Sequence, residues 1–215
     1  AVLDILGYKA PELISYSYVL LDGDKMSTSN GTVVLVTDFM KAVKETLLKE
    51  FEKRNTTISE EKLQILCNAC IKFTMLNVSK KKIVNFNLEN ATSFNGESGM
   101  YILYSLVRIN SILKNNDIEL IEDIEYKYDI ENKLVKELSY FPEIVGDLLK
   151  SHEPSHLTKY IFGLTQLFSK FYEQVNITNE ENLLLKSSRL RLLKCFDKVI
   201  KEALSILGID TIDSI

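Results

Sequence analysis

The chain has 215 residues, of which 46% are hydrophobic and 26% charged, enough to bury one sizeable core or two small ones. Its 8 Gly and 3 Pro are too few turn residues for an all-β protein of this length, so a mainly helical fold is expected. The formal net charge of -4 excludes attraction of polyanions by the molecule as a whole, and any contact with nucleic acid must come from local patches.

The three cysteines, Cys67, Cys70 and Cys195, form an odd and sparse set. With no secretory leader and no apolar run long enough to span a bilayer, this set predicts a reducing, cytoplasmic location and no membrane partner. The chain opens on the apolar run from Ala1 to Tyr8, which is typical of the end of a helix. We therefore expect a piece cut from a larger protein.

A polar loop between two strands is predicted near the start of the chain. Residues 13–21 and 32–36 mix alternation with β-branched and aromatic residues, as strands do. Residues 22–31 are rich in turn formers and should be exposed and mobile. They contain Lys25-Met26-Ser27-Thr28-Ser29, which matches four of the five positions of the pattern K-M-S-K-S.

A lysine on such a loop can approach polyphosphate oxygens and neutralise the charge that develops as pyrophosphate leaves. A four-in-five match arises by chance in roughly one chain in a hundred of this length. An ordinary surface turn with a solvated lysine is the alternative, and the pattern alone does not decide between the two.

Helical spacing governs most of the remaining sequence. It predicts helices over residues 38–53 and, with Ser59 as the cap, from about 60 to 78. A short strand and a compact loop are predicted over residues 83–99. Helices over about 100–115, 130–151, 155–175 and 180–207 follow, and their short connections predict an antiparallel bundle.

The helix over residues 100–114 carries Tyr101, Tyr104 and Arg108 on one face, at intervals of three and four. Two aromatic rings and a guanidinium suit stacking on unstacked RNA bases. Periodicity alone favours the alternative, in which the tyrosines lie at the edge of the core. On the last helix, a basic stripe suited to RNA phosphates consists of Arg191, Lys194, Lys198 and Lys201. A solvated stripe is the alternative there.

Two apparent metal motifs are rejected. The stretch from His152 to His156 spells H-E-x-x-H, but Pro154 disfavours one continuous helix through both histidines. Cys67 and Cys70 form a lone C-x-x-C without a second pair, so buried packing is expected for both thiols. No metal site is predicted.

Six blocks together resemble arginyl-tRNA synthetases, a family of class I aminoacyl-tRNA synthetases. The residues concerned are Lys25–Val34, Ile71–Lys80, Val84–Asn90, Ser93–Tyr104, Ser188–Leu192 and Ala203–Ile209. The last two look like the terminal helix of the DALR anticodon-binding domain. The sequence departs from the family pattern at Thr28, Ser29, Ser98 and Met100, and the first two leave the loop less basic.

The resemblance implies two domains: residues 1–99 as the C-terminal end of a class I catalytic core with a short β element, and residues 100–215 as the antiparallel helical anticodon-binding domain. It implies that Lys25 is catalytic and that the ATP signature loop comprises Lys25, Met26, Ser27, Thr28, Ser29 and Gly31. It further implies tRNA or anticodon contacts by Asn95, Gly96, Tyr101, Tyr104, Arg108, Lys194, Lys198 and Ile215.

The full-length enzyme would be a cytoplasmic monomer that joins arginine to tRNA-Arg through an arginyl-adenylate, using ATP and Mg2+. The fragment would bind neither tightly and would not aminoacylate, because the other half of the active site is missing. The rival hypothesis is a non-catalytic helical scaffold that binds RNA or protein through the Tyr101 face.

Overall fold

The computed structural model describes residues 2–9, 11–21, 23–25, 35–116 and 118–214, and within them the predicted mainly helical fold is confirmed. The helices are α1 (Val2–Ile5), α2 (Val36–Lys53), α3 (Glu60–Leu76), α4 (Leu88–Ala91), α5 (Gly99–Asn115), α6 (Asp129–Ser139), α7 (Phe141–Ser151), α8 (Pro154–Gln174) and α9 (Leu183–Ile206). The strands are β1 (Val19–Leu21), β2 (Asp24–Lys25) and β3 (Val84–Phe86).

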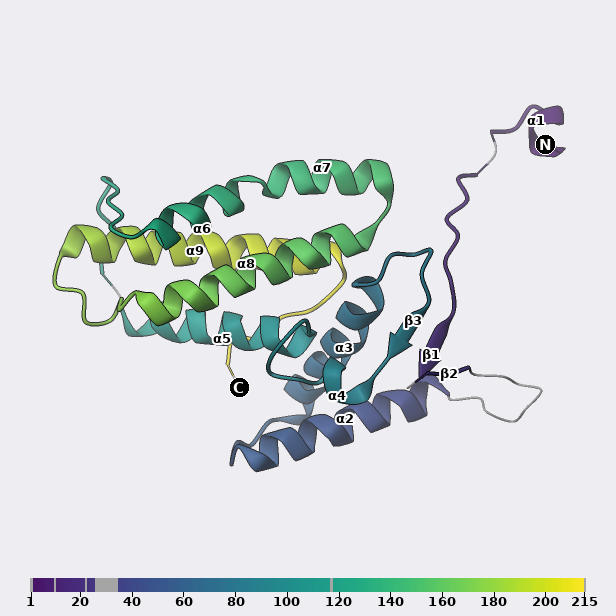
Figure 1. Ribbon diagram of the computed structural model, residues 1–215, viewed down its shortest axis with the longest axis horizontal. Coiled ribbons are helices and arrows are strands. Elements are labelled where there is room, and N and C mark those ends of the chain that lie inside the picture. The colour runs from purple at the N-terminus through teal and green to yellow at the C-terminus, as the bar shows by residue number, and fades with distance from the viewer. Residues whose placement is uncertain (1, 10, 22, 26–34, 117, 215) are drawn as a thin grey trace.

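The predicted antiparallel bundle is formed by α5 to α9, which run along the long axis of the molecule (Figure 1). Helices α2 and α3 lie beneath one end of this bundle, and the N-terminal segment with α1 extends away from the body of the molecule. None of the helices in the described residues is long and apolar enough to span a membrane.

One continuous core connects α2 and α3 with the bundle, from Val43 to Ile212. Helix α3 and the first turn of α5 approach each other closely. A Cβ atom added to Gly99 would lie 2.5 Å from the carbonyl oxygen of Ala69, so only glycine allows this contact. The predicted domain division between residues 99 and 100 stays a prediction.

The short β element is a three-stranded sheet with the order β2-β1-β3. Strands β1 and β2 pair antiparallel, with Leu20 opposite Lys25, whereas β1 and β3 pair parallel, with Val19 opposite Val84. The predicted strand over residues 13–21 is therefore confirmed only at its end. Of the strand predicted over 32–36, residues 32–34 lie outside the described residues, and Val36 instead begins α2, whose acidic first turn includes Asp38.

The prediction of one helix over residues 130–151 is wrong, because the chain breaks into α6 and α7 at Tyr140. Pro142 lies in the first turn of α7, where its missing N–H leaves no hydrogen bond broken, whereas in a continuous helix it would break one. The cap predicted at Ser59 is confirmed, since its side chain accepts a hydrogen bond from the backbone N–H of Lys62 at 3.4 Å.

Candidate nucleic-acid interface

The turn that precedes α5 fixes where this helix begins. Ser98 caps it: the Ser98 Oγ accepts a hydrogen bond from the N–H of Tyr101 at 3.1 Å and donates one to the carbonyl of Ser93 at 2.5 Å. Gly96 has a φ of +81°, a left-handed conformation that favours glycine. Asn95 and Gly96, both predicted RNA contacts, are exposed at the tip of this turn.

Five aromatic and arginine side chains from the end of α2, this turn, α5 and α8 contact one another in a row. The Arg54 guanidinium lies 3.9 Å from the centroid of the Phe94 ring, and Phe94 meets Tyr104 edge to face at 5.5 Å between centroids. The Arg108 guanidinium lies 5.2 Å from the Tyr104 ring centroid and 4.8 Å from that of Tyr172. We call these five side chains the aromatic-arginine row.

The row joins the end of α2 to α8 by way of α5. Arg54 is exposed, Phe94 is buried, Tyr104 and Arg108 are half-buried, and the Tyr172 residue is 42% exposed. Planar rings and guanidinium groups that are partly open to solvent give flat faces for stacking, and Arg108 adds a positive charge between two rings. Of the predicted RNA-binding residues, the row includes Tyr104 and Arg108.

Tyr101 points toward α8. Its hydroxyl group forms a hydrogen bond of 2.7 Å with the Ser169 Oγ, and its ring meets Phe162 edge to face at 6.0 Å. The ring is half-buried, as the alternative of a core-edge tyrosine requires. The assignment of Tyr101 to RNA stays a prediction, and the described contacts give it a structural role as well.

A hollow of about 380 Å³ lies next to Tyr172, between α5 and the end of α8. Ile112 forms one wall, and residues 172–178 form the other. The last carbonyl groups of a helix have no partner within the helix and remain free to accept hydrogen bonds. The hollow therefore combines an aromatic face with hydrogen-bond acceptors, a combination that suits an unstacked base.

The four residues of the predicted basic stripe on α9 differ in their contacts with the rest of the protein. Lys201 forms an ion pair with Asp197 at 3.0 Å, and Arg191 donates a hydrogen bond to the carbonyl of Ile121. Lys194 and Lys198 are exposed, and neither forms an ion pair with another described residue. Only these two, which were the predicted RNA contacts, remain available to phosphates.

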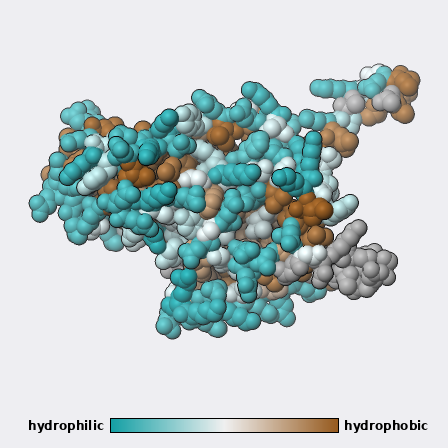
Figure 2. All heavy atoms as spheres, in the orientation of Figure 1, coloured by the Kyte–Doolittle hydropathy of each residue, from teal (hydrophilic) through white to brown (hydrophobic). Residues whose placement is uncertain are grey.

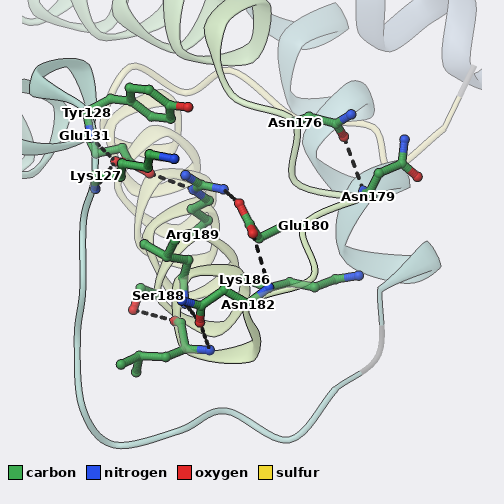
Figure 3. A network of polar contacts seen from close by, with 12 residues as sticks. Lys127, Tyr128, Glu131, Asn176, Asn179, Glu180, Asn182, Lys186, Ser188 and Arg189 are labelled. Atoms are coloured by element: carbon green, nitrogen blue, oxygen red, sulfur yellow. Dashed lines mark hydrogen bonds and ion pairs between the residues drawn. The ribbon is translucent and has the colours of Figure 1, made fainter.

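The first half of α9 is anchored by a buried ion network (Figure 3). Arg189 is 1% exposed; its Nε donates to Glu131 at 2.6 Å and its Nη1 donates to Glu180 at 2.5 Å. Glu131 is itself fully buried, and its second oxygen accepts the backbone N–H groups of Lys127 and Tyr128 at 2.7 and 2.6 Å. The network joins α6, α9 and the connection between α8 and α9.

The neighbouring serines of α9 hold the irregular segment before α6. The Ser187 Oγ accepts the N–H of Ile121 at 2.7 Å, and the Ser188 Oγ accepts the N–H of Glu125 at 2.9 Å. The block from Ser188 to Leu192, one of the motifs in the sequence, thus anchors chain segments that have no helix or strand of their own. This explains its composition without a contact to RNA.

Most of the predicted ATP signature loop lies outside the described residues. These residues are Met26, Ser27, Thr28, Ser29 and Gly31, and Ile215 is likewise outside. The backbone of Lys25 belongs to β2 and pairs with Leu20 of β1. The catalytic assignment of Lys25 stays a prediction.

The rejected motifs have structural roles. His152 ends α7 in a left-handed conformation (φ 49°) and Pro154 begins α8, so the two histidines of H-E-x-x-H do not share a helix. The Glu153 carboxylate accepts hydrogen bonds from Ser79, Ser155 and the Lys80 N–H. Although burial raises the pKa of Glu153, these bonds outweigh it and lower the pKa below its ordinary value.

Cys67 and Cys70 are fully buried in α3, which confirms the expected packing role. Burial raises the pKa of both thiols, that of Cys70 to about 12. A thiol with so high a pKa carries almost no thiolate at neutral pH.

Three members of the aromatic-arginine row were missed in the sequence. Arg54 follows α2 and Tyr172 lies on α8, each more than forty residues from α5 along the chain, and no local spacing connects them to it. Phe94 lies within Ser93–Tyr104, one of the blocks that resemble the family. Its position just before the capped helix α5 is the sequence signal that could have identified it.

Comparisons with known proteins match the helical bundle and nearly the whole chain. A family model described as "DALR anticodon binding domain" matches residues 102–215. The chain is 30% identical to the "Arginine--tRNA ligase" of Methanococcus aeolicus, covering 98% of this chain and 38% of that protein. It is 33% identical to the "Arginine--tRNA ligase 1" of Bacillus cereus, covering 97% of this chain and 38% of that protein.

Among solved structures, Thermus thermophilus arginyl-tRNA synthetase has the same fold. It matches with a TM-score of 0.85 and 24% identity, over 93% of this chain and 35% of that one. The chain thus spans little more than a third of the length of these relatives.

Proposed function

Because the chain belongs to the family of DALR anticodon-binding domains, we propose that its helical bundle binds the anticodon loop of tRNA-Arg. In this proposal the chain is the C-terminal part of a longer arginine-tRNA ligase, as its relatives are named. The ligase activity belongs to that longer protein, which acts in the cytoplasm as a monomer. The alternative is a non-catalytic helical scaffold that binds RNA or another protein.

The observation that carries the proposal is the placement of Arg108 between the rings of Tyr104 and Tyr172. An anticodon loop presents unstacked bases, which bind by stacking on aromatic rings and guanidinium planes. Tyr104 and Arg108 offer such faces on α5, and Tyr172 offers one beside the hollow at the end of α8. Lys194 and Lys198 on α9 contribute phosphate contacts that position the RNA without reading it.

The chemical part of the proposal concerns Lys25. In the longer protein its ammonium group would stabilise the charge that develops as pyrophosphate leaves ATP during formation of arginyl-adenylate. Met26, Ser27, Thr28, Ser29 and Gly31 would shape the loop that brings Lys25 to ATP. Mg2+ would accompany ATP in the longer protein, and no step described here depends on it.

The test is a binding titration of this chain with a tRNA-Arg transcript and with the same transcript after exchange of its anticodon bases. Replacing Tyr104 or Tyr172 by alanine should weaken binding to tRNA-Arg by about 1 to 3 kcal/mol per lost base stack. Lys133 is exposed on α6, and Lys133→Ala is the control for an unrelated surface change.

The two hypotheses predict different results. Loss of affinity in the Tyr104 and Tyr172 variants, with a preference for the arginine anticodon, supports the proposal. A chain that binds neither transcript, or binds both equally and is indifferent to the tyrosines, supports the scaffold. Thermal melting of each variant separates weaker binding from unfolding.

A further inference from the structure

A groove of about 830 Å³ lies between α2 and the α4 segment. Residues from Thr46 to Arg54 line one wall, and residues from Asn87 to Asn95 line the other. Figure 2 shows hydrophilic side chains over the α2 side of the molecule, at the bottom of the view. Phe94 and Arg54 belong both to this groove and to the aromatic-arginine row, so the two surfaces are continuous.

The charges of the groove leave two basic groups available. Lys53 is paired with Glu50 at 2.5 Å, and that pair is neutral as a whole. Lys49 and Arg54 are exposed and form no ion pair within the described part of the chain. Glu89 on the opposite wall is the remaining acidic group of the lining.

Arg54 is arranged to bind an anion. The Arg54 guanidinium lies over the Phe94 ring, with its Cζ 3.9 Å from the ring centroid, and this contact restricts the side chain while its N–H groups remain exposed to solvent. A guanidinium in a fixed plane presents paired donors that match two oxygens of one phosphate. Lys49 lies on α2, a little over one helical turn before Arg54, and supplies a second, more flexible charge on the same wall.

We propose that this groove binds backbone phosphates of the RNA strand that leaves the anticodon loop toward the anticodon stem, with Lys49 and Arg54 as the contacts. The inference rests on the proposed function, because it requires that anticodon-loop bases stack on Tyr104 and Arg108. A strand stacked there continues past Phe94 to Arg54 and enters the groove. Glu89 faces the same strand and opposes its binding.

The test is a salt titration of tRNA-Arg binding to this chain and its variants. Each phosphate contact contributes about 0.7 to 0.9 to the slope of log K against log salt. The double variant Lys49→Ala with Arg54→Ala should therefore lower the slope by about 1.5 and weaken binding roughly ten-fold at low salt. Glu89→Gln should tighten binding by about two-fold, because it removes a like charge.

Two further variants keep the test valid. Lys133→Ala on α6 removes the same type of charge outside the groove and should leave the slope unchanged. If the double variant melts at a lower temperature than the wild type, Lys49→Glu replaces it, because Lys49 is exposed and its reversal should lower the slope without loss of packing.

A slope equal to that of Lys133→Ala, in variants that melt like the wild type, would overturn the inference. So would a Glu89→Gln variant with weaker binding. Neither result would touch the proposed function, which fails only if the wild-type chain does not bind tRNA-Arg or if Tyr104→Ala leaves that binding unchanged.

Discussion

Arg189 is a buried cation, and the structure shows what stabilises it there. Its guanidinium is buried, and it meets the carboxylates of Glu131 and Glu180. Its Nη2 has no hydrogen-bond partner among the described residues, so the pairing is incomplete on one side. Removing a partner from such a network is costly because the remaining charge stays buried.

The stability of the bundle should therefore depend strongly on Arg189. Arg189→Ala leaves Glu131 charged and buried, and we expect a loss of about 3 to 5 kcal/mol in the free energy of unfolding, measured with urea. Adding Glu131→Gln should recover part of it, because the amide oxygen still accepts the N–H groups of Lys127 and Tyr128. A loss below about 1 kcal/mol would contradict this account of the network.

The lowered pKa of Glu180 predicts how the free energy of unfolding changes as the pH falls. The Asn182 N–H and then the Arg189 guanidinium lower the pKa of Glu180 below its ordinary value of 4.5. Its contribution to stability is complete above pH 4.5 and is lost as the pH falls toward the lowered pKa, because the unfolded chain takes up the proton first. Urea unfolding between neutral and acidic pH should show a steeper decline for wild type than for Glu180→Gln. Parallel curves would exclude the linkage.

At the scale of elements, the face of α5 that was predicted to meet RNA divides into two parts. Tyr101 is held by Ser169 and Phe162 of α8, whereas Tyr104 and Arg108 belong to the row that reaches Tyr172. A helical wheel places all three on one face because it contains only the angles around one helix. The position of α8 over that face decides which of them is partly covered.

This division gives a prediction for Tyr101. Tyr101→Phe keeps the ring but removes the hydrogen bond to Ser169, so the free energy of unfolding should fall by about 1 kcal/mol while tRNA affinity is unchanged. Tyr104→Phe is the matched control and should keep wild-type stability. Loss of tRNA affinity in Tyr101→Phe, with native stability, would show that the hydroxyl group contacts RNA.

The elements that could be predicted are those with a strong local pattern. Residues Phe39, Val43 and Leu47 recur at intervals of four in α2, and Ser59 caps α3, so both helices were predicted within about two residues. The break at Tyr140 was missed because Pro142 is compatible both with a kink and with a new first turn. Arg54, Phe94 and Tyr172 become one row only through packing between distant segments, which periodicity does not contain.

At the scale of the whole molecule, the β hairpin and the α8 end of the aromatic-arginine row lie at opposite ends. The β hairpin that holds Lys25 is at the end of the molecule opposite the left end of the bundle, where α8 ends and α9 begins (Figure 1). The hairpin is joined to the core through β3, since Phe86 is fully buried and meets Phe39 edge to face at 4.6 Å. Substitutions at the two ends should therefore act on separate steps.

Lys25 gives the prediction for the chemical step. In the longer protein, Lys25→Ala should lower kcat of arginine-dependent pyrophosphate exchange by about 100- to 1,000-fold, the usual cost of losing one group that stabilises transition-state charge. The KM for arginine should change little, because the ammonium group acts mainly in the transition state and not on bound arginine.

The matched comparison is Lys25→Arg, which keeps the positive charge and should retain part of the activity, while Tyr104→Ala should weaken tRNA binding instead. The 215-residue chain without the rest of the protein should show no exchange above a blank, with or without tRNA, because Lys25 alone does not position ATP against the amino acid. Normal kcat with a raised KM for arginine in Lys25→Ala would assign this lysine to substrate binding, and exchange by the isolated chain would place a complete catalytic site within it.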